Sequence, residues 1–118
     1  MVLEAKGVDG TVRFDGETVV IRYKGAVRFR RKLGRTPVED IRIPLTDVAT
    51  VHFQPSSLLW NGFVRFEVTG VESVTPPPES KPVVAVKYAL RDRNSVVFSR
   101  YQDKEFAALR AAVDEARA

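Results

Sequence analysis

Hydrophobic and polar residues alternate with a period of two along most of this 118-residue chain. In residues 63–68, for example, Val64, Phe66 and Val68 alternate with Arg65 and Glu67. Successive side chains of a β-strand point to opposite faces, so this alternation predicts half-buried antiparallel strands. The segments with this pattern are 12–14, 19–23, 41–46, 48–53, 63–68, 84–90 and 96–98. About seven strands are therefore expected.

The residues between these segments are typical of tight turns. Asp9-Gly10 and Asp15-Gly16 suit hairpin turns that need positive φ, and Asn61-Gly62 opens the strand that begins at Phe63. A polar stretch at 91–94 separates the last two predicted strands. Short strands at such regular spacing predict a mainly β sandwich or barrel.

Only residues 102–117 show a helical pattern. The predicted helix is capped by Asp103, and its polar side carries Glu105, Arg110, Asp114 and Glu115. Its apolar stripe comprises Phe106, Leu109, Ala112, Val113 and Ala116. A single amphipathic helix that follows a series of strands must bury its stripe against the sheet. We therefore expect this helix to close one side of the β core.

A proline-rich stretch interrupts the alternation at residues 71–82. It contains Pro76, Pro77 and Pro78 in succession, followed by Pro82. This composition predicts an exposed, partly polyproline-like loop, interpreted as a stiffened hairpin insertion. The length of the chain allows one core, so residues 1–118 are expected to form a single domain.

Several short motifs, in order along the chain, resemble an actinobacterial domain family of unknown function. They lie at residues 3–7, 10–16, 43–45, 61–66, 94–98 and 106–113. The resemblance implies an origin in such bacteria or in their phages. It also implies a bacterial relative of the pleckstrin-homology (PH) domain, with two nearly orthogonal sheets and one end closed by the C-terminal helix. It implies no catalytic residue.

Positive charge is concentrated in one segment of the chain. The formal net charge is +4, yet residues 22–35 hold seven of the 19 basic residues and no acidic one. The remaining 12 basic residues face 15 acidic residues, so the rest of the chain is negative. Arg28, Arg30 and Lys32 would share one face of an extended segment, about 6.6 Å apart, a spacing comparable to that of adjacent phosphates.

This basic hairpin is a candidate anion-binding site. Its candidate residues are Lys24, Arg28, Arg30, Arg31, Lys32 and Arg35. The resemblance supports the assignment, since the lipid-phosphate site of eukaryotic PH domains lies on a hairpin between early strands. The alternative interpretation is a hairpin that is simply solvated or faces a protein.

A second candidate site is the apolar run Leu58, Leu59 and Trp60. Three large apolar residues before a turn are difficult to bury together, and Trp is a favoured interface anchor. The alternative is that Trp60 covers one mouth of the barrel.

Chemistry-bearing motifs do not occur in the sequence. There is no cysteine, the single histidine (His52) is interpreted as a surface or sheet-edge residue, and no nucleophile or phosphate-loop motif is present. We expect no catalysis, metal or cofactor. No apolar run approaches the roughly 20 residues of a membrane span. The first ten residues lack the apolar stretch of a signal peptide, so the cytoplasm is the expected location.

These observations predict a non-catalytic interaction module that binds a protein partner or further copies of itself, which would make a homo-oligomer. The alternative is binding to an anionic surface, nucleic acid or acidic lipid, through the basic hairpin at 22–35.

Overall fold

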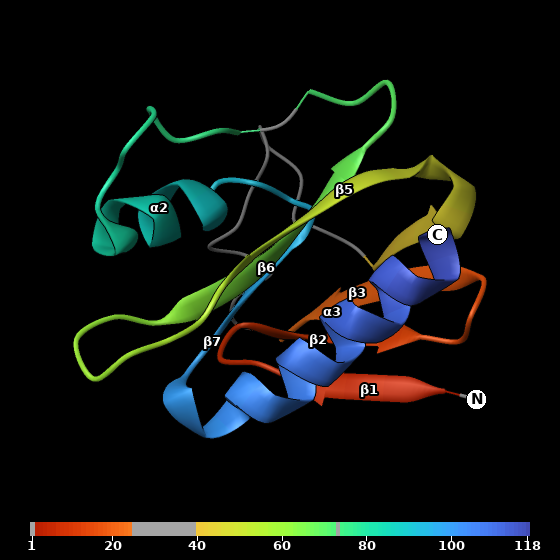
Figure 1. Ribbon diagram of the computed structural model, residues 1–118, viewed down its shortest axis with the longest axis horizontal. Coiled ribbons are helices and arrows are strands. Elements are labelled where there is room, and N and C mark those ends of the chain that lie inside the picture. The colour runs from red at the N-terminus through yellow and green to blue at the C-terminus, as the bar shows by residue number, and fades with distance from the viewer. Residues whose placement is uncertain (1, 25–39, 73) are drawn as a thin grey trace.

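The computed structural model describes residues 2–24, 40–72 and 74–118. Within them, seven strands form two antiparallel sheets (Figure 1). The first sheet has the order β1 (Leu3–Lys6), β2 (Gly10–Phe14), β3 (Thr18–Tyr23), β4 (Ile41–Pro44). The second has the order β5 (Val48–Gln54), β6 (Gly62–Val68), β7 (Ser95–Phe98). The predicted mainly β fold is confirmed.

The helical elements lie between and after the strands. They are η1 (Leu45–Asp47), α2 (Pro82–Ala89), η2 (Arg100–Gln102) and the C-terminal helix α3 (Asp103–Arg117). Helix α3 confirms the one helix expected from the sequence, within a residue at each end. Asp103 does not cap it, because the N-cap position is held by Gln102 without a side-chain bond.

Helix α2 corrects the strand predicted at 84–90. Pro82 occupies the first turn of this helix, where its missing N–H costs nothing. Ala85 and Ala89, four residues apart, pack one face of α2 on Phe63 and Val97 of the second sheet. The proline-rich segment therefore ends before Pro82 and links β6 to α2, so it is not a hairpin insertion.

The structure still has seven strands, as expected, because β1, which the sequence analysis did not predict, offsets the strand wrongly predicted at 84–90. This strand pairs with β2 along its whole length, from Leu3 opposite Phe14 to Lys6 opposite Thr11. Its one buried side chain is Ala5. The strand is short: Leu3-Glu4-Ala5-Lys6 alternates, but four residues with a small apolar residue at Ala5 give a weak signal, which explains the omission.

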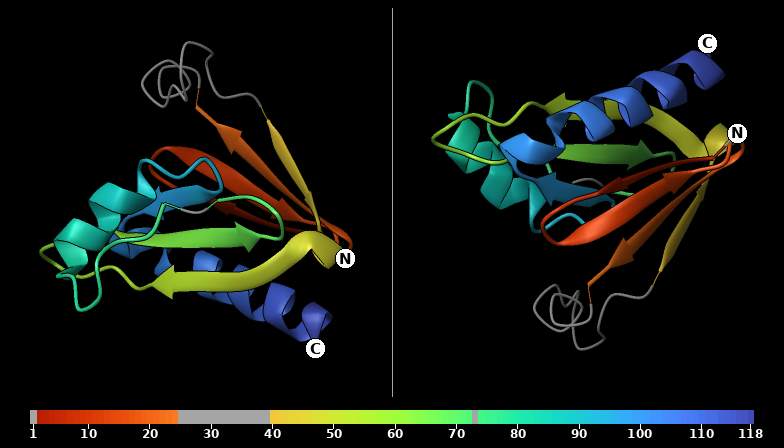
Figure 2. Two further views of the ribbon diagram at one scale, coloured as in Figure 1. Left: turned by 90° about the horizontal axis from the view of Figure 1, so that it is seen from above. Right: turned by 90° about the horizontal axis from the view of Figure 1, so that it is seen from below.

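The main core lies between the two sheets and is completed by α3. Phe106, Leu109 and Val113 of the helix are buried, whereas Ala116 at the end of the predicted stripe is exposed. The ring of Phe106 stacks on Phe98 with 4.5 Å between ring centroids. Helix α2 covers the opposite face of the second sheet (Figures 1 and 2).

Polar contacts fix α3 to strands of both sheets. Near its start, Asp103 accepts hydrogen bonds from Ser56, just beyond the end of β5. At its other end, Arg117 donates to the carbonyl oxygens of Val48 and Ala49, at the start of β5. Glu105 accepts a bond from the backbone N–H of Lys6 in β1, at 3.4 Å. The helix thus joins an edge strand of each sheet.

Candidate functional site

The loop between β5 and β6 presents two leucines to solvent. Leu58 is 81% exposed and Leu59 is 85% exposed, while Trp60 beside them is half-buried. The loop protrudes at one end of the molecule, in yellow-green, beyond α2 and η2 (Figures 1 and 2). Two hydrogen bonds close it, from Ser57 N–H to the Trp60 carbonyl at 2.9 Å and from Leu59 N–H to Ser57 Oγ at 3.1 Å.

Helices on both sides hold this loop in place. Ser56 donates its N–H to Asp103 Oδ1 at 3.0 Å and its hydroxyl to Asp103 Oδ2 at 2.6 Å, which ties one side to α3. Gln54 Nε2 donates to the Pro82 carbonyl at 3.2 Å, which ties the other side to α2. The exposed leucines therefore sit on a fixed support.

The base of the loop is packed too closely for any residue but glycine at position 62. A Cβ on Gly62 would lie 2.4 Å from the Gln54 carbonyl oxygen and 2.5 Å from a ring carbon of Phe98. Both distances are far below van der Waals contact, and the first atom belongs to the backbone, which cannot move aside easily. The glycine of the Asn61-Gly62 pair, predicted to open the strand, is thus required by close packing and not by a positive φ.

A groove of about 330 Å³ separates the loop from α2. It is lined by Ser57, Leu58, Leu59, Trp60, Asn61, Val83 and Val86. Val83 is half-exposed at its rim. Tyr101 of η2, two residues before the Asp103 that bonds to Ser56, is 82% exposed. We call the surface formed by residues 57–61, Val83, Val86 and Tyr101 the apolar end.

The structure describes only part of the basic segment. Arg22 is in β3, where its Nε lies 3.1 Å from Asp40 Oδ2, and the exposed Lys24 follows that strand. Arg28, Arg30, Arg31, Lys32 and Arg35 lie outside the described residues. The hypothesis of a basic anion-binding hairpin therefore stays a prediction.

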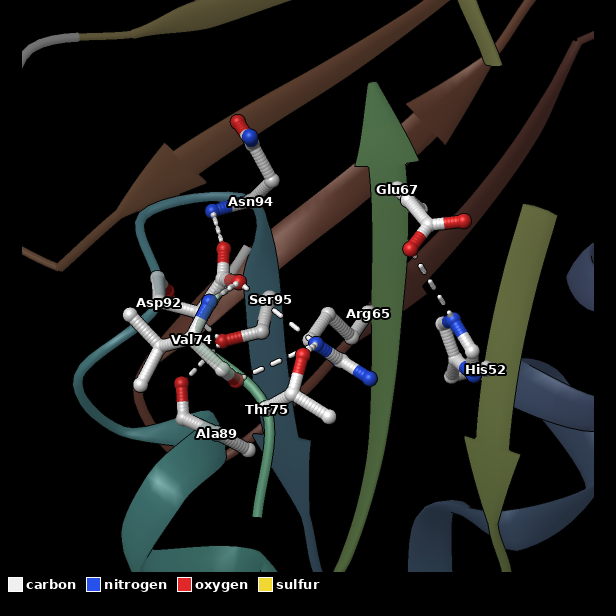
Figure 3. Close-up of polar contacts among 9 residues, drawn as sticks. All are labelled: His52, Arg65, Glu67, Val74, Thr75, Ala89, Asp92, Asn94 and Ser95. Atoms are coloured by element: carbon white, nitrogen blue, oxygen red, sulfur yellow. Dashed lines mark hydrogen bonds and ion pairs between the residues drawn. The ribbon is translucent and has the colours of Figure 1, made fainter. Parts of the chain in front are cut away.

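A buried ion pair lies on the second sheet, on the face that α2 covers (Figure 3). Arg65 of β6 and Asp92, in the turn between α2 and β7, have side chains only 6% and 4% exposed, with 3.9 Å between Arg65 Nη1 and Asp92 Oδ2. Arg65 Nη1 also donates to the Val74 carbonyl at 3.1 Å. Asp92 accepts from the N–H of Val74 at 3.1 Å and from that of Asn94 at 2.8 Å. This polar cluster fastens the segment after β6 onto the sheet.

The buried hydroxyl of Ser95 belongs to the same cluster and is committed to the fold. It bonds to the carbonyl oxygens of Ala89 and Asp92, which joins the end of α2 to the start of β7. The burial of these polar residues could not be predicted from the sequence. The sequence analysis predicted neither helix α2 nor the packing of residues 74–75 over this face of the sheet.

His52 lies in β5, an edge strand of the second sheet, as the sequence indicated. Its Nε2 is 3.9 Å from Glu67 Oε1 on the neighbouring strand. Burial, together with the charge of Arg65, holds the pKa of His52 below its ordinary value of 6.5, against the opposing effect of Glu67 and Asp92. Across the described ranges, no three His, Asp or Glu side chains are grouped so that they could hold a metal ion.

A second shallow pocket, of about 270 Å³, lies on the solvent side of the first sheet. Arg13, Arg22 and Arg42 contribute to its walls, but so do Glu4 and Asp15. Asp15 is engaged by the turn between β2 and β3, where the N–H groups of Glu17 and Thr18 donate to it and lower its pKa. Charges of both signs are typical of a solvated sheet face.

Comparison with known proteins gives one match. Residues 12–114 match a family described as a domain of unknown function (DUF4429). No curated protein and no solved structure matches the chain.

Proposed function

The chain belongs to the DUF4429 family of domains of unknown function, and we propose that it is a non-catalytic interaction module that docks through its apolar end. The observation that supports this most is the exposure of Leu58 and Leu59 on a loop fixed to both α2 and α3. Covering a leucine side chain is worth roughly 1.5–3 kcal/mol. A partner that covers both would gain about 3–6 kcal/mol without having to order the loop first.

We also infer that the fold is of the PH type. The support is the arrangement of antiparallel strands in a sheet of four and a sheet of three, with a C-terminal helix packed between edge strands of the two, all within the described residues. The sheets do not close into a barrel, and α2 is an addition on the outer face. An origin in actinobacteria or their phages, and a cytoplasmic location, stay predictions.

The sequence analysis predicts a protein partner or a second copy of the chain as the occupant. Self-association tests it most directly, by light scattering over a range from micromolar to near-millimolar protein. We expect the mass to rise with concentration in the parent and to stay monomeric in Leu58→Ser/Leu59→Ser. Val71→Ser, which replaces a half-exposed valine beyond the far end of β6, is the matched control and should behave as the parent.

The possible outcomes test the identity of the partner and the docking role separately. A parent protein that stays monomeric at every concentration would exclude a second copy of the chain as the docking partner. The docking role of the apolar end fails altogether if the double serine variant matches the parent in mass and also in binding to every surface offered, lipid vesicles included.

A further inference from the structure

We infer that the apolar end is a membrane-docking surface, in which Leu58 and Leu59 enter the interface of an anionic lipid bilayer while Trp60 and Tyr101 lie near its headgroups. This inference rests on the proposed function and names the occupant of that site. It concerns a protein that lies on the bilayer; in the part of the chain that the structure describes, no helix is long and apolar enough to cross one.

The chemistry of the exposed residues favours lipid over protein. The two most exposed side chains of the apolar end are leucines, which are under-represented among the residues that dominate protein–protein binding. Leucine is instead among the residues that enter hydrocarbon most favourably. Trp60 follows the leucines directly, and the exposed Tyr101 comes two residues before Asp103, which bonds to Ser56 at the base of the loop. Trp and Tyr concentrate where a bilayer meets water.

The shape of the apolar end agrees with this choice. The loop that carries the leucines forms one end of the molecule, beside α2 (Figures 1 and 2). Both leucine side chains are more than 80% exposed, so a surface that approaches this end can reach them. The bonds of Ser56 to Asp103 and of Gln54 to Pro82 keep this loop projecting. Insertion then requires no unfolding of the sheet.

The charges around the apolar end complement an anionic surface. Its elements and their flanks, residues 54–62, 79–91 and 99–104, carry five cations and two acids. These are Lys81, Lys87, Arg91, Arg100 and Lys104 against Glu79 and Asp103. The carboxylate of Asp103 is already occupied by Ser56. Three of these cations adjoin contacts of the loop: Lys81 precedes Pro82, which bonds to Gln54, and Arg100 and Lys104 lie just before and after the segment from Tyr101 to Asp103, which bonds to Ser56. All three are exposed, so positive charge lies beside the apolar end.

Trp60 makes the inference directly measurable, because it is the only tryptophan in the chain. The full chain is titrated with vesicles of phosphatidylcholine, and with vesicles of equal parts phosphatidylcholine and phosphatidylglycerol. With the anionic vesicles we expect the emission of Trp60 to shift to shorter wavelength, and the apparent affinity to fall as salt rises. Neutral vesicles should bind at least tenfold more weakly, since several cations contribute about fivefold each at such a surface.

Three variants separate the contributions. Leu58→Ser/Leu59→Ser should weaken binding at least tenfold while its melting temperature stays near that of the parent, because both side chains are exposed in the free protein. Lys81→Ser/Lys104→Ser should weaken binding to anionic vesicles about twenty-fivefold, fivefold for each cation removed, and leave binding to neutral vesicles unchanged. Val71→Ser should bind as the parent does.

Several results would overturn the inference. Co-sedimentation with anionic vesicles without a shift of Trp60 would assign binding to the basic segment at 22–35 instead. If neutral vesicles shifted the emission of Trp60 equally, with no effect of salt, the proposed selectivity for anionic lipid would be wrong. Absence of any vesicle binding would exclude lipid as the occupant of the apolar end. The proposed docking function would then still stand if Leu58→Ser/Leu59→Ser abolished self-association. If that variant self-associated as the parent does, the proposed function would fail together with this inference.

Discussion

His52 couples the stability of the fold to pH. Its pKa is lowered in the folded protein mainly by burial, and then by the charge of Arg65. As the pH falls through 6.5, His52 becomes protonated in the unfolded chain but stays neutral in the folded protein, so the free energy of unfolding decreases. The decrease ends once the pH is below the folded-state pKa. Thermal melts between about pH 5 and about pH 8 should show it.

The matched variant for this prediction is His52→Gln. Because His52 is the only histidine in the chain, its removal should flatten the pH dependence in the window just below 6.5. The carboxylates titrate mostly at lower pH and will still cause acid unfolding in both proteins. Parallel curves for parent and variant across the window would show that His52 titrates alike in both states.

A buried leucine and an exposed leucine should differ greatly in how much their truncation lowers the free energy of unfolding. Leu109 is 1% exposed and belongs to the core, so Leu109→Ala should lower the free energy of unfolding by about 2–5 kcal/mol. Leu59→Ala should change it by no more than about 0.5 kcal/mol, because that side chain is already in water. Urea denaturation measures both. A comparable loss in the Leu59 variant would show that the loop packs against something in solution.

At the scale of elements, the Arg65–Asp92 pair fastens the segment after β6 and the turn after α2. Arg65→Leu should cost about 3 kcal/mol, because Asp92 would keep its buried charge and lose its cation. Arg65→Leu/Asp92→Asn should recover part of that loss, since no buried charge of this pair remains. Hydrogen exchange at the amide of Val74, which donates to Asp92, reports the loosening locally. Equal stability of the single and double variants would contradict the coupling.

Alternation identifies most directly the strands that have one buried face. Strands β2 and β3 each bury one set of alternating residues between the sheets and leave the other set partly or fully exposed. Strand β6 keeps the alternating pattern although α2 covers its second face, because a charged residue, Arg65, is buried there in an ion pair. Helix α2 covers the second sheet with alanines four residues apart, and its valines at 83, 84 and 86 are only partly buried. A short apolar segment of this kind fits both periods, and Pro82 at its start was the available signal for helix.

The candidate site was predictable in part. A run of three large apolar residues before a turn marks Leu58, Leu59 and Trp60 without any structure. What fixes them is not predictable, because Ser56 and Asp103 are 47 residues apart and Gln54 and Pro82 are 28 apart. Local periodicity carries no information about such pairs. In β5 the register shift between Val48 and Thr50 also changes which residues face the core, and both Val48 and Val51 are buried.

At the scale of the whole molecule, α3 joins the two sheets. Its contacts with Ser56 at one end of β5 and with Val48 and Ala49 at the other place it along an edge strand, while Glu105 reaches β1. Pairing of that edge with another chain is a recognised route to aggregation, and a packed helix prevents it. The helix therefore has two effects, since it completes the core and covers β5.

Removing α3 should consequently abolish the folded state. A chain ending at Arg100 loses Phe106, Leu109 and Val113, each worth roughly 1.5–3 kcal/mol, against a total stability of about 5–15 kcal/mol for a small domain. We expect no cooperative melting transition by circular dichroism, and aggregation through the uncovered β5. The control ends at Ala116, which removes the bonds from Arg117 to β5 but keeps the stripe, and should lose only about 1–3 kcal/mol. A chain ending at Arg100 that melts cooperatively near the parent temperature would show that the sheets are stable without their helix, and the assignment of α3 to the core would then be wrong.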